Sequence, residues 1–166
     1  MVREPIEQSL SAYFENFAHF RKQITGDADD PKTVFSHFLT TNPHAGAVNW
    51  FDRELRDQLG IDVYQERFDH DARYAWLSDQ STLIMRADCP DERKSAVLSE
   101  IFDTDITVTR SNEGHEKPTG PLYANVKALA AYDDALLDKM FGNRFMRHFW
   151  SEAELQEARR RLSGNC

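Results

Sequence analysis

Cysteine is scarce in this chain: only Cys89 and Cys166 occur among 166 residues. Two cysteines cannot form a disulfide framework, and neither stands at a spacing typical of metal ligands. The six histidines are scattered along the chain, so the sequence predicts no metal site. Free thiols fit a reducing compartment, which favours a cytoplasmic protein.

Long apolar runs are also missing. No stretch of the sequence is hydrophobic enough to span a bilayer. The first residues include Arg3, Glu4 and Glu7 and no long apolar core, so they do not look like a secretory leader. We therefore expect no transmembrane segment, and at most a peripheral contact with a membrane.

Positive charge is in the minority. The chain has 20 Lys and Arg against 28 Asp and Glu, which gives a formal net charge of −8. This balance argues against a general nucleic-acid-binding protein, because phosphate backbones require clustered cations. Internal repeats and low-complexity segments are absent too, whereas hydrophobic residues make up 40% of the chain. The composition therefore predicts one globular domain over residues 1–166.

Apolar residues recur mostly at helical spacing. In the last predicted helix, Ser151 and Glu154 stand in the positions of a capping box, and Asp88 is placed to cap an earlier one. The expected helices cover about residues 5–24, 32–39, 48–59 and 90–102, and three more follow residue 120. Short strands are expected at 74–77, 82–85 and 106–109, and a polar loop at 110–118.

The opening segment combines groups that suit a phosphate. A strand would end near Arg3, and a helix would begin near Pro5, where the missing N–H of proline costs nothing. Such a strand-to-helix turn directs free backbone N–H groups outward and forms a natural anion site. Arg3 adds a guanidinium, and Ser11, almost two turns into the helix, can add a hydroxyl. The plainer alternatives are a surface arginine and a serine that bonds back to its own helical turn.

The same residues carry a family resemblance. An arginine, an acid and a proline, followed by a serine eight positions after the arginine, resemble the 3′-phosphate-binding motif of sulfotransferases. These enzymes use 3′-phosphoadenosine 5′-phosphosulfate (PAPS) as sulfate donor. In the family, the arginine and the serine contact the 3′-phosphate of the donor. The resemblance carries this role to Arg3 and Ser11.

Further segments are similar to the capsular polysaccharide synthesis branch of this superfamily, which is found in bacteria. The likeness covers nearly the whole chain, although Trp150 stands where the branch pattern has tyrosine. The polar loop and the helix after it share in the likeness, which implies that Asn112 and Lys117 contact the nucleotide of the donor. The segments that carry the likeness are 50–55, 60–64, Phe68, 83–86, Asn112, Lys117, Tyr123 and 147–151.

The resemblance implies an α/β fold of three layers around a parallel sheet, of the P-loop-kinase type. This chain would be the mostly helical C-terminal portion of that fold. A complete relative would transfer a sulfuryl group from PAPS to a saccharide hydroxyl in capsular or surface polysaccharide synthesis, without a metal. The loop that holds the 5′-phosphosulfate precedes the arginine motif in the family and is not in this sequence. We therefore expect the isolated chain to transfer sulfate poorly or not at all, and to self-associate through exposed sheet edges.

Two questions stay open at the level of sequence. The proton acceptor for the saccharide hydroxyl is one: Asp52 and Glu54 are candidates, but Asp52 could equally pair with Arg56 four residues later. The class of function is the other. A non-enzymatic helical binding module, or a degenerate relative that keeps part of the fold, would also fit the acidic charge. Affinity for 3′,5′-bisphosphoadenosine discriminates between the two classes.

Overall fold

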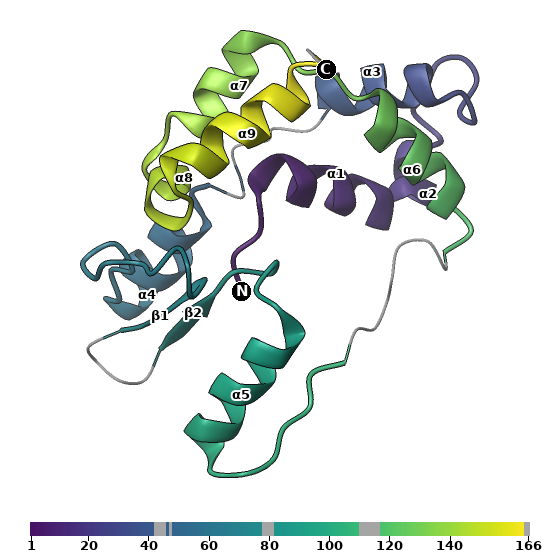
Figure 1. Cartoon of the computed structure of the whole chain (residues 1–166). Helices are drawn as coiled ribbons and strands as arrows, with labels where there is room; N and C mark the ends of the chain where they lie inside the picture. Colours follow the sequence, from purple (N-terminus) through teal and green to yellow (C-terminus); the bar gives the residue numbers. More distant parts are fainter. Residues whose placement is uncertain (42–45, 47, 78–81, 110–116, 165–166) are drawn as a thin grey trace.

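The computed structural model in Figure 1 consists mostly of helices and contains one small sheet among the described residues. The structure describes residues 1–41, 46, 48–77, 82–109 and 117–164. The helices are α1 (Pro5–Glu15), α2 (Phe17–Phe20), α3 (Pro31–Thr41), the π-helix η1 (Phe51–Arg56), α4 (Asp57–Leu59), α5 (Asp91–Phe102), α6 (Gly120–Leu129), α7 (Asp134–Phe141), α8 (Arg144–Phe149) and α9 (Glu152–Leu162). The strands are β1 (Tyr74–Trp76) and β2 (Leu83–Met85).

Helix α1 crosses the middle of the molecule (Figure 1). Helices α7, α8 and α9 pack on one another beside its first turn, and α3 packs against α6 near its other end. The two strands and α4 lie below α8, and α5 extends away from them. This arrangement places the start of α1 between the sheet, α6 and α9.

The sheet consists of β1 and β2 in antiparallel register, with Ala75 opposite Ile84. The first residues of the chain add a single parallel bridge to it. Val2 donates its N–H to the carbonyl of Met85 at 2.7 Å and accepts the N–H of Ala87 at 2.6 Å. The chain then leaves the sheet and enters α1 at Pro5, so the predicted helix start is confirmed, whereas an isolated bridge at Val2 stands where a strand was expected.

An aromatic core holds these elements together. Apolar side chains of α1 and α2, such as Leu10, Tyr13 and Phe17, are buried, and the Tyr13 ring packs edge-on against Phe38 of α3. A second group surrounds Phe149, whose side chain is 0% exposed. Each fully buried aromatic ring removes a large apolar area from water, so these two groups supply most of the packing energy.

Helix starts and stops follow local rules in several places. The capping box of Ser151 and Glu154 at the start of α9 is confirmed. Gly60 ends α4 with a φ of 72°, the left-handed conformation that a glycine C-cap adopts most easily. The predicted helix at 5–24 instead breaks at Asn16, whose side-chain N–H bonds the Ala12 carbonyl at 3.0 Å. The side chain of Asn16 thus takes a backbone acceptor of the helix and turns the chain.

Other expectations are wrong for identifiable reasons. Asp88 does not cap α5: Pro90 holds the cap position, and Asp88 pairs with arginine side chains instead. Residues 106–109 form no strand. Their N–H groups donate to the hydroxyls of Ser99 and Ser95, at 2.8 and 2.9 Å, and so follow α5 rather than a partner strand. The segment 78–81, which joins the two strands, lies outside the described residues.

Within the described ranges, no helix combines the length and the apolar character that crossing a bilayer requires.

Candidate functional site

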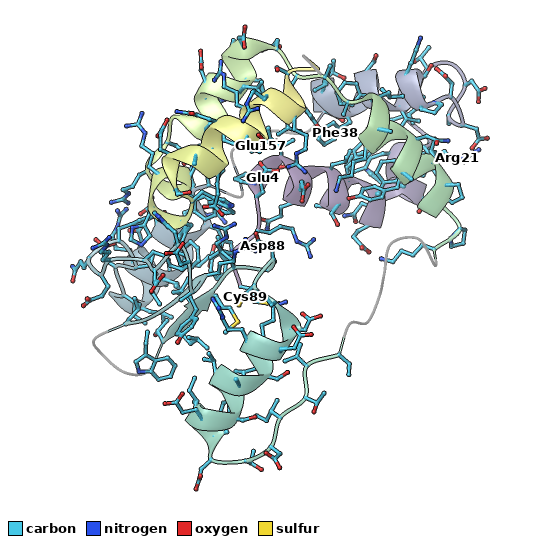
Figure 2. All side chains as sticks on the ribbon, in the orientation of Figure 1. Glu4, Arg21, Phe38, Asp88, Cys89 and Glu157 are labelled. Atoms are coloured by element: carbon cyan, nitrogen blue, oxygen red, sulfur yellow. The ribbon has the colours of Figure 1, made fainter. Side chains whose placement is uncertain are left out.

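A cavity of about 1900 Å³ opens between α1, the end of β2, α5, α6 and α9. Sites for small ligands commonly span about 300 to 1,000 Å³, so this cavity can hold a nucleotide together with part of a second substrate. Figure 2 shows three of its lining residues, Glu4, Asp88 and Glu157, near the centre of the molecule. They come from three separate parts of the chain.

Arg3 and Ser11 both line this cavity. Arg3 stands between the Val2 bridge and the start of α1, and its side chain is exposed. Ser11 lies further along α1. Within the described residues, its hydroxyl makes no hydrogen bond back to its own turn, in contrast to Ser95, which donates to the Asp91 carbonyl at 2.7 Å. The two residues of the arginine–serine motif therefore share one wall of the cavity.

The cavity walls carry both signs of charge, and nearly all of the cations are neutralised by neighbours. Among the cationic side chains, Arg3 is the exception: it makes no ion pair with any other residue that the structure describes. It is thus the cationic side chain of the cavity whose charge an incoming anion can use without displacing a carboxylate. The paired cations are Arg86 with Asp88 and Glu154, Lys94 with Asp91, Lys117 with Glu15, and Lys127 and Arg161 with Glu7.

The predicted backbone contribution to the anion site is wrong. Glu4 caps α1 with its own carboxylate, which accepts the N–H groups of Ile6 and Glu7 at 2.8 Å each. The N–H of Gln8 bonds the Glu4 carbonyl, so the first turn has no N–H left to offer. Burial raises the pKa of Glu4 to about 7, against the effect of the two N–H donors. An anion at this wall must therefore rely on side chains.

Another part of the cavity lining is built around Arg86, which is 2% exposed. Its guanidinium bonds Asp88 at 2.6 Å and Glu154 at 2.8 Å. Burial alone would raise the pKa of Glu154, but hydrogen bonds from Arg86 and Ser151 outweigh it and lower that pKa to about 2. The pKa of Asp88 is lowered in the same way, because its bonds to Arg86 outweigh its own burial. Both carboxylates therefore stay charged at neutral pH.

Glu154→Gln is expected to flatten the loss of stability in acid. The pKa of Glu154 falls from 4.5 to about 2 on folding, so its contribution is complete above pH 4.5 and is lost as pH falls toward 2. Partial exposure reduces the effect to about 1–2 kcal/mol. Urea unfolding at pH 5.5 and pH 2.5 measures it, and equal pH dependence in the variant and the parent protein would contradict the assignment.

The other residues of the family likeness that were expected near the nucleotide differ in their positions relative to the cavity. Lys117 lines the cavity, but its ammonium is 2.5 Å from the Glu15 carboxylate, so binding a phosphate would compete with this pair. Tyr123 also lines the cavity and packs edge-on against Phe14, with ring centroids 5.1 Å apart. Asn112 lies outside the described residues.

The two candidate bases lie away from this cavity. Asp52 and Glu54 belong to η1, and no described residue of η1 lines the cavity. Asp52 pairs with Arg56 at 2.8 Å, as the spacing allowed, and also with Arg144. Glu54 pairs with Arg53 at 2.9 Å. These contacts favour the interpretation of both carboxylates as members of surface ion pairs.

Sequence reasoning missed the two most buried charged residues at the cavity, Glu4 and Arg86. Glu4 precedes Pro5, and an acid directly before a proline at the first helical position is a recognisable capping signal. Arg86 ends a run of three apolar residues and precedes Asp88 by two. Its second partner, Glu154, is far away in the sequence, and no local pattern indicates that contact.

Metal ligation receives no support from the geometry. Among the described residues, no group of three or more His, Cys, Asp or Glu side chains is arranged to hold a metal ion. Cys89 is buried and lies 3.8 Å from the Ala72 carbonyl, and burial raises the pKa of its thiol.

Comparison with known proteins identifies the family. Residues 28–151 match the family described as "Putative capsular polysaccharide synthesis protein". The match includes β1, β2, α5 and Arg86, and it begins after Arg3 and Ser11. Comparisons with curated proteins and with solved structures give no significant match. Since the family match spans most of the sequence, the chain belongs to this family of capsular polysaccharide synthesis proteins.

Proposed function

We propose that this protein binds PAPS through its 3′-phosphate at Arg3 and Ser11. It would serve the transfer of the sulfuryl group to a saccharide hydroxyl during capsular polysaccharide synthesis. Family membership supports the involvement in capsule synthesis. The sulfate donor and the reaction are inferred from the arginine–serine motif, and a P-loop-kinase-like relationship of the fold belongs to the same proposal.

One observation carries the proposal: Arg3 and Ser11 line the same cavity, and Arg3 has no ion pair with another described residue there. Since no carboxylate of a described residue holds the exposed Arg3 guanidinium, an incoming anion can bind it without first breaking an ion pair. Its planar fork can bind two phosphate oxygens at once, which a hydroxyl from Ser11 can supplement. This arrangement fits a phosphate monoester better than a carboxylate or a neutral sugar.

The cavity also has room for the chemistry. In sulfuryl transfer, a saccharide oxygen forms a bond to sulfur, the bond from sulfur to the 5′-phosphate oxygen breaks, and the hydroxyl proton is released. Binding of the 3′-phosphate would hold the donor at a point distant from the sulfuryl group that is transferred. The whole cavity measures about 1900 Å³, so space for the saccharide is left beside a bound donor.

The protein is expected to bind 3′,5′-bisphosphoadenosine more tightly than adenosine 5′-phosphate. The two ligands differ only in the 3′-phosphate, and a charge-assisted phosphate contact is worth about 1.5–3 kcal/mol, or about 10- to 100-fold in Kd. Isothermal titration calorimetry at fixed ionic strength measures both values. Equal affinity for the two nucleotides would overturn the assignment of a 3′-phosphate site.

A non-enzymatic binding module is the second candidate, and a specific observation favours it. The first-turn N–H groups of α1 are taken by Glu4, and seven carboxylates line the cavity, so little is left to stabilise charge that develops on a transferred group. Incubation with labelled PAPS and bacterial surface glycans separates the candidates. Nucleotide binding without label transfer would favour the module, and sulfated product would favour the transferase.

A further inference from the structure

Arg86 is the most deeply buried charged residue of the described chain, and nearly all of its donors are engaged. Its Nε and Nη2 atoms donate to the two oxygens of Asp88 at 2.9 and 2.6 Å, as a two-pronged pair. Nη2 also lies 2.8 Å from Glu154, and Nη1 donates to the Phe149 carbonyl at 3.1 Å. The guanidinium lies over the Trp150 ring, 4.9 Å from its centroid. A side chain so fully occupied is poorly suited to bind a substrate directly.

These contacts join the end of β2 to two helices, α8 and α9, that lie far from it in the sequence. Arg86 follows β2, Phe149 ends α8, and Glu154 lies in the first turn of α9. Glu154 also completes the capping box with Ser151, so the start of α9 is fixed through the same carboxylate. The side chain of Arg86 thus holds the end of β2 in one position relative to α8 and α9.

The backbone on either side of Arg86 holds the beginning of the chain. Val2 bonds Met85 and Ala87, the two neighbours of Arg86, at 2.7 and 2.6 Å. Arg3 follows Val2 directly. Arg3 is therefore the direct neighbour of Val2, whose backbone is bonded to the segment that Arg86 fixes in place.

We propose that Arg86 is a positioning residue for Arg3. By locking the end of β2 onto α8 and α9, it fixes the segment that holds Val2 and so keeps the Arg3 guanidinium at the cavity wall, where the nucleotide 3′-phosphate binds. The proposal rests on the proposed function of Arg3, and it adds a residue that has no contact with the ligand.

Burial of the ion pairs does not by itself explain why an arginine occupies this position. Desolvation of the charges offsets much of their attraction, and apolar replacements of buried ion pairs are often tolerated or stabilising. What an apolar residue or a lysine cannot supply is a planar fork that bonds two carboxylates and a carbonyl while lying over an indole. The geometry of the contacts, more than their net energy, sets the position of the segment.

The test uses Arg86→Lys, which keeps the charge and removes the fork. We expect it to weaken the binding of 3′,5′-bisphosphoadenosine on the order of tenfold, because a small displacement of the binding group is costly. Binding of adenosine 5′-phosphate is expected to stay unchanged, since that ligand makes no contact with Arg3. In the double variant with Arg3→Ala, the lysine is expected to cause no further loss, because Arg86 acts through Arg3.

Arg144→Lys is the matched control. Arg144 also lies over an aromatic ring, 3.9 Å from the centroid of Tyr64, and pairs with Asp52, but it does not line the cavity. It should leave the binding of both nucleotides unchanged. Should Arg86→Lys fail to fold, as judged by circular dichroism, Asp88→Asn removes one partner of the fork at a half-exposed position and is expected to weaken binding several-fold.

The outcomes separate the two proposals. If the parent protein does not prefer the 3′-phosphorylated nucleotide, the function proposed for Arg3 is wrong, and the role of Arg86 falls with it. If the parent protein prefers that nucleotide and Arg3→Ala removes the preference, but Arg86→Lys binds both nucleotides like the parent, only the role of Arg86 is overturned. An equal loss for both nucleotides, or additive losses in the double variant, would show that Arg86 is merely structural.

Discussion

Arg3→Ala is expected to weaken the binding of 3′,5′-bisphosphoadenosine by about 10- to 100-fold and to leave the stability of the protein nearly unchanged. The loss in affinity follows from removing a charge-assisted, two-pronged contact to a phosphate. The small effect on stability follows from the surroundings of Arg3, which is exposed and has no ion pair with a described residue. Substitutions at such positions usually change the free energy of unfolding by no more than about 0.5 kcal/mol.

Calorimetry of nucleotide binding and thermal unfolding of the same samples measure the two effects. Arg21→Ala is the control for charge: Arg21 is exposed, pairs with Asp29 at 2.6 Å, and does not line the cavity. Arg3→Lys should recover part of the affinity, because a lysine keeps the charge but loses the fork. Unchanged affinity in Arg3→Ala, or an equal loss in Arg21→Ala, would contradict the assignment of Arg3 to a phosphate site.

The predictions that succeeded depended on local chemistry. The capping box at α9 requires only two residues three positions apart. The two strands were predicted as separate apolar runs, and they pair in the structure. Each of these signals lies within a few residues of the feature that it predicts.

The predictions that failed were decided by partners elsewhere in the chain. Asp88 has the right residue type and place for a helix cap, but the buried guanidinium of Arg86 and the partly exposed one of Arg73 pair with it instead. Charged pairs of this kind are stronger than a single hydrogen bond to a helix N–H. A local propensity therefore loses to a contact that only the folded chain can supply.

At the candidate site, too, local patterns indicated some features, whereas contacts in the folded chain decided others. Arg3 and Ser11 were indicated by spacing and resemblance, and the structure places both on one cavity. The cap at Glu4 changed which groups can serve an anion there, because it uses the N–H groups that the strand-to-helix turn was expected to offer. The pattern indicated two residues that share a cavity, but it did not indicate the cap that decides which other groups there can donate to an anion.

Phe149 is the residue whose loss should cost the fold most. Its side chain is 0% exposed, and the rings of Phe68, Phe145 and Phe51 lie with centroids 5.0, 5.2 and 5.5 Å from its own. These neighbours come from η1, α8 and the segment before β1, so a cavity here cannot close by the movement of one element. We expect Phe149→Ala to lower the free energy of unfolding by about 3–5 kcal/mol.

This loss is a large part of the roughly 5–15 kcal/mol that stabilises a typical domain. Phe102→Ala is the matched control, because that ring is 64% exposed and its removal should cost no more than about 0.5 kcal/mol. Denaturant unfolding of both variants at pH 7 gives the comparison. Since the Phe149 carbonyl also accepts a hydrogen bond from Arg86, a collapse of this core should weaken nucleotide binding as well. A stable Phe149→Ala protein would mean that the aromatic group around Phe149 does not hold Arg86 and its part of the cavity lining in place.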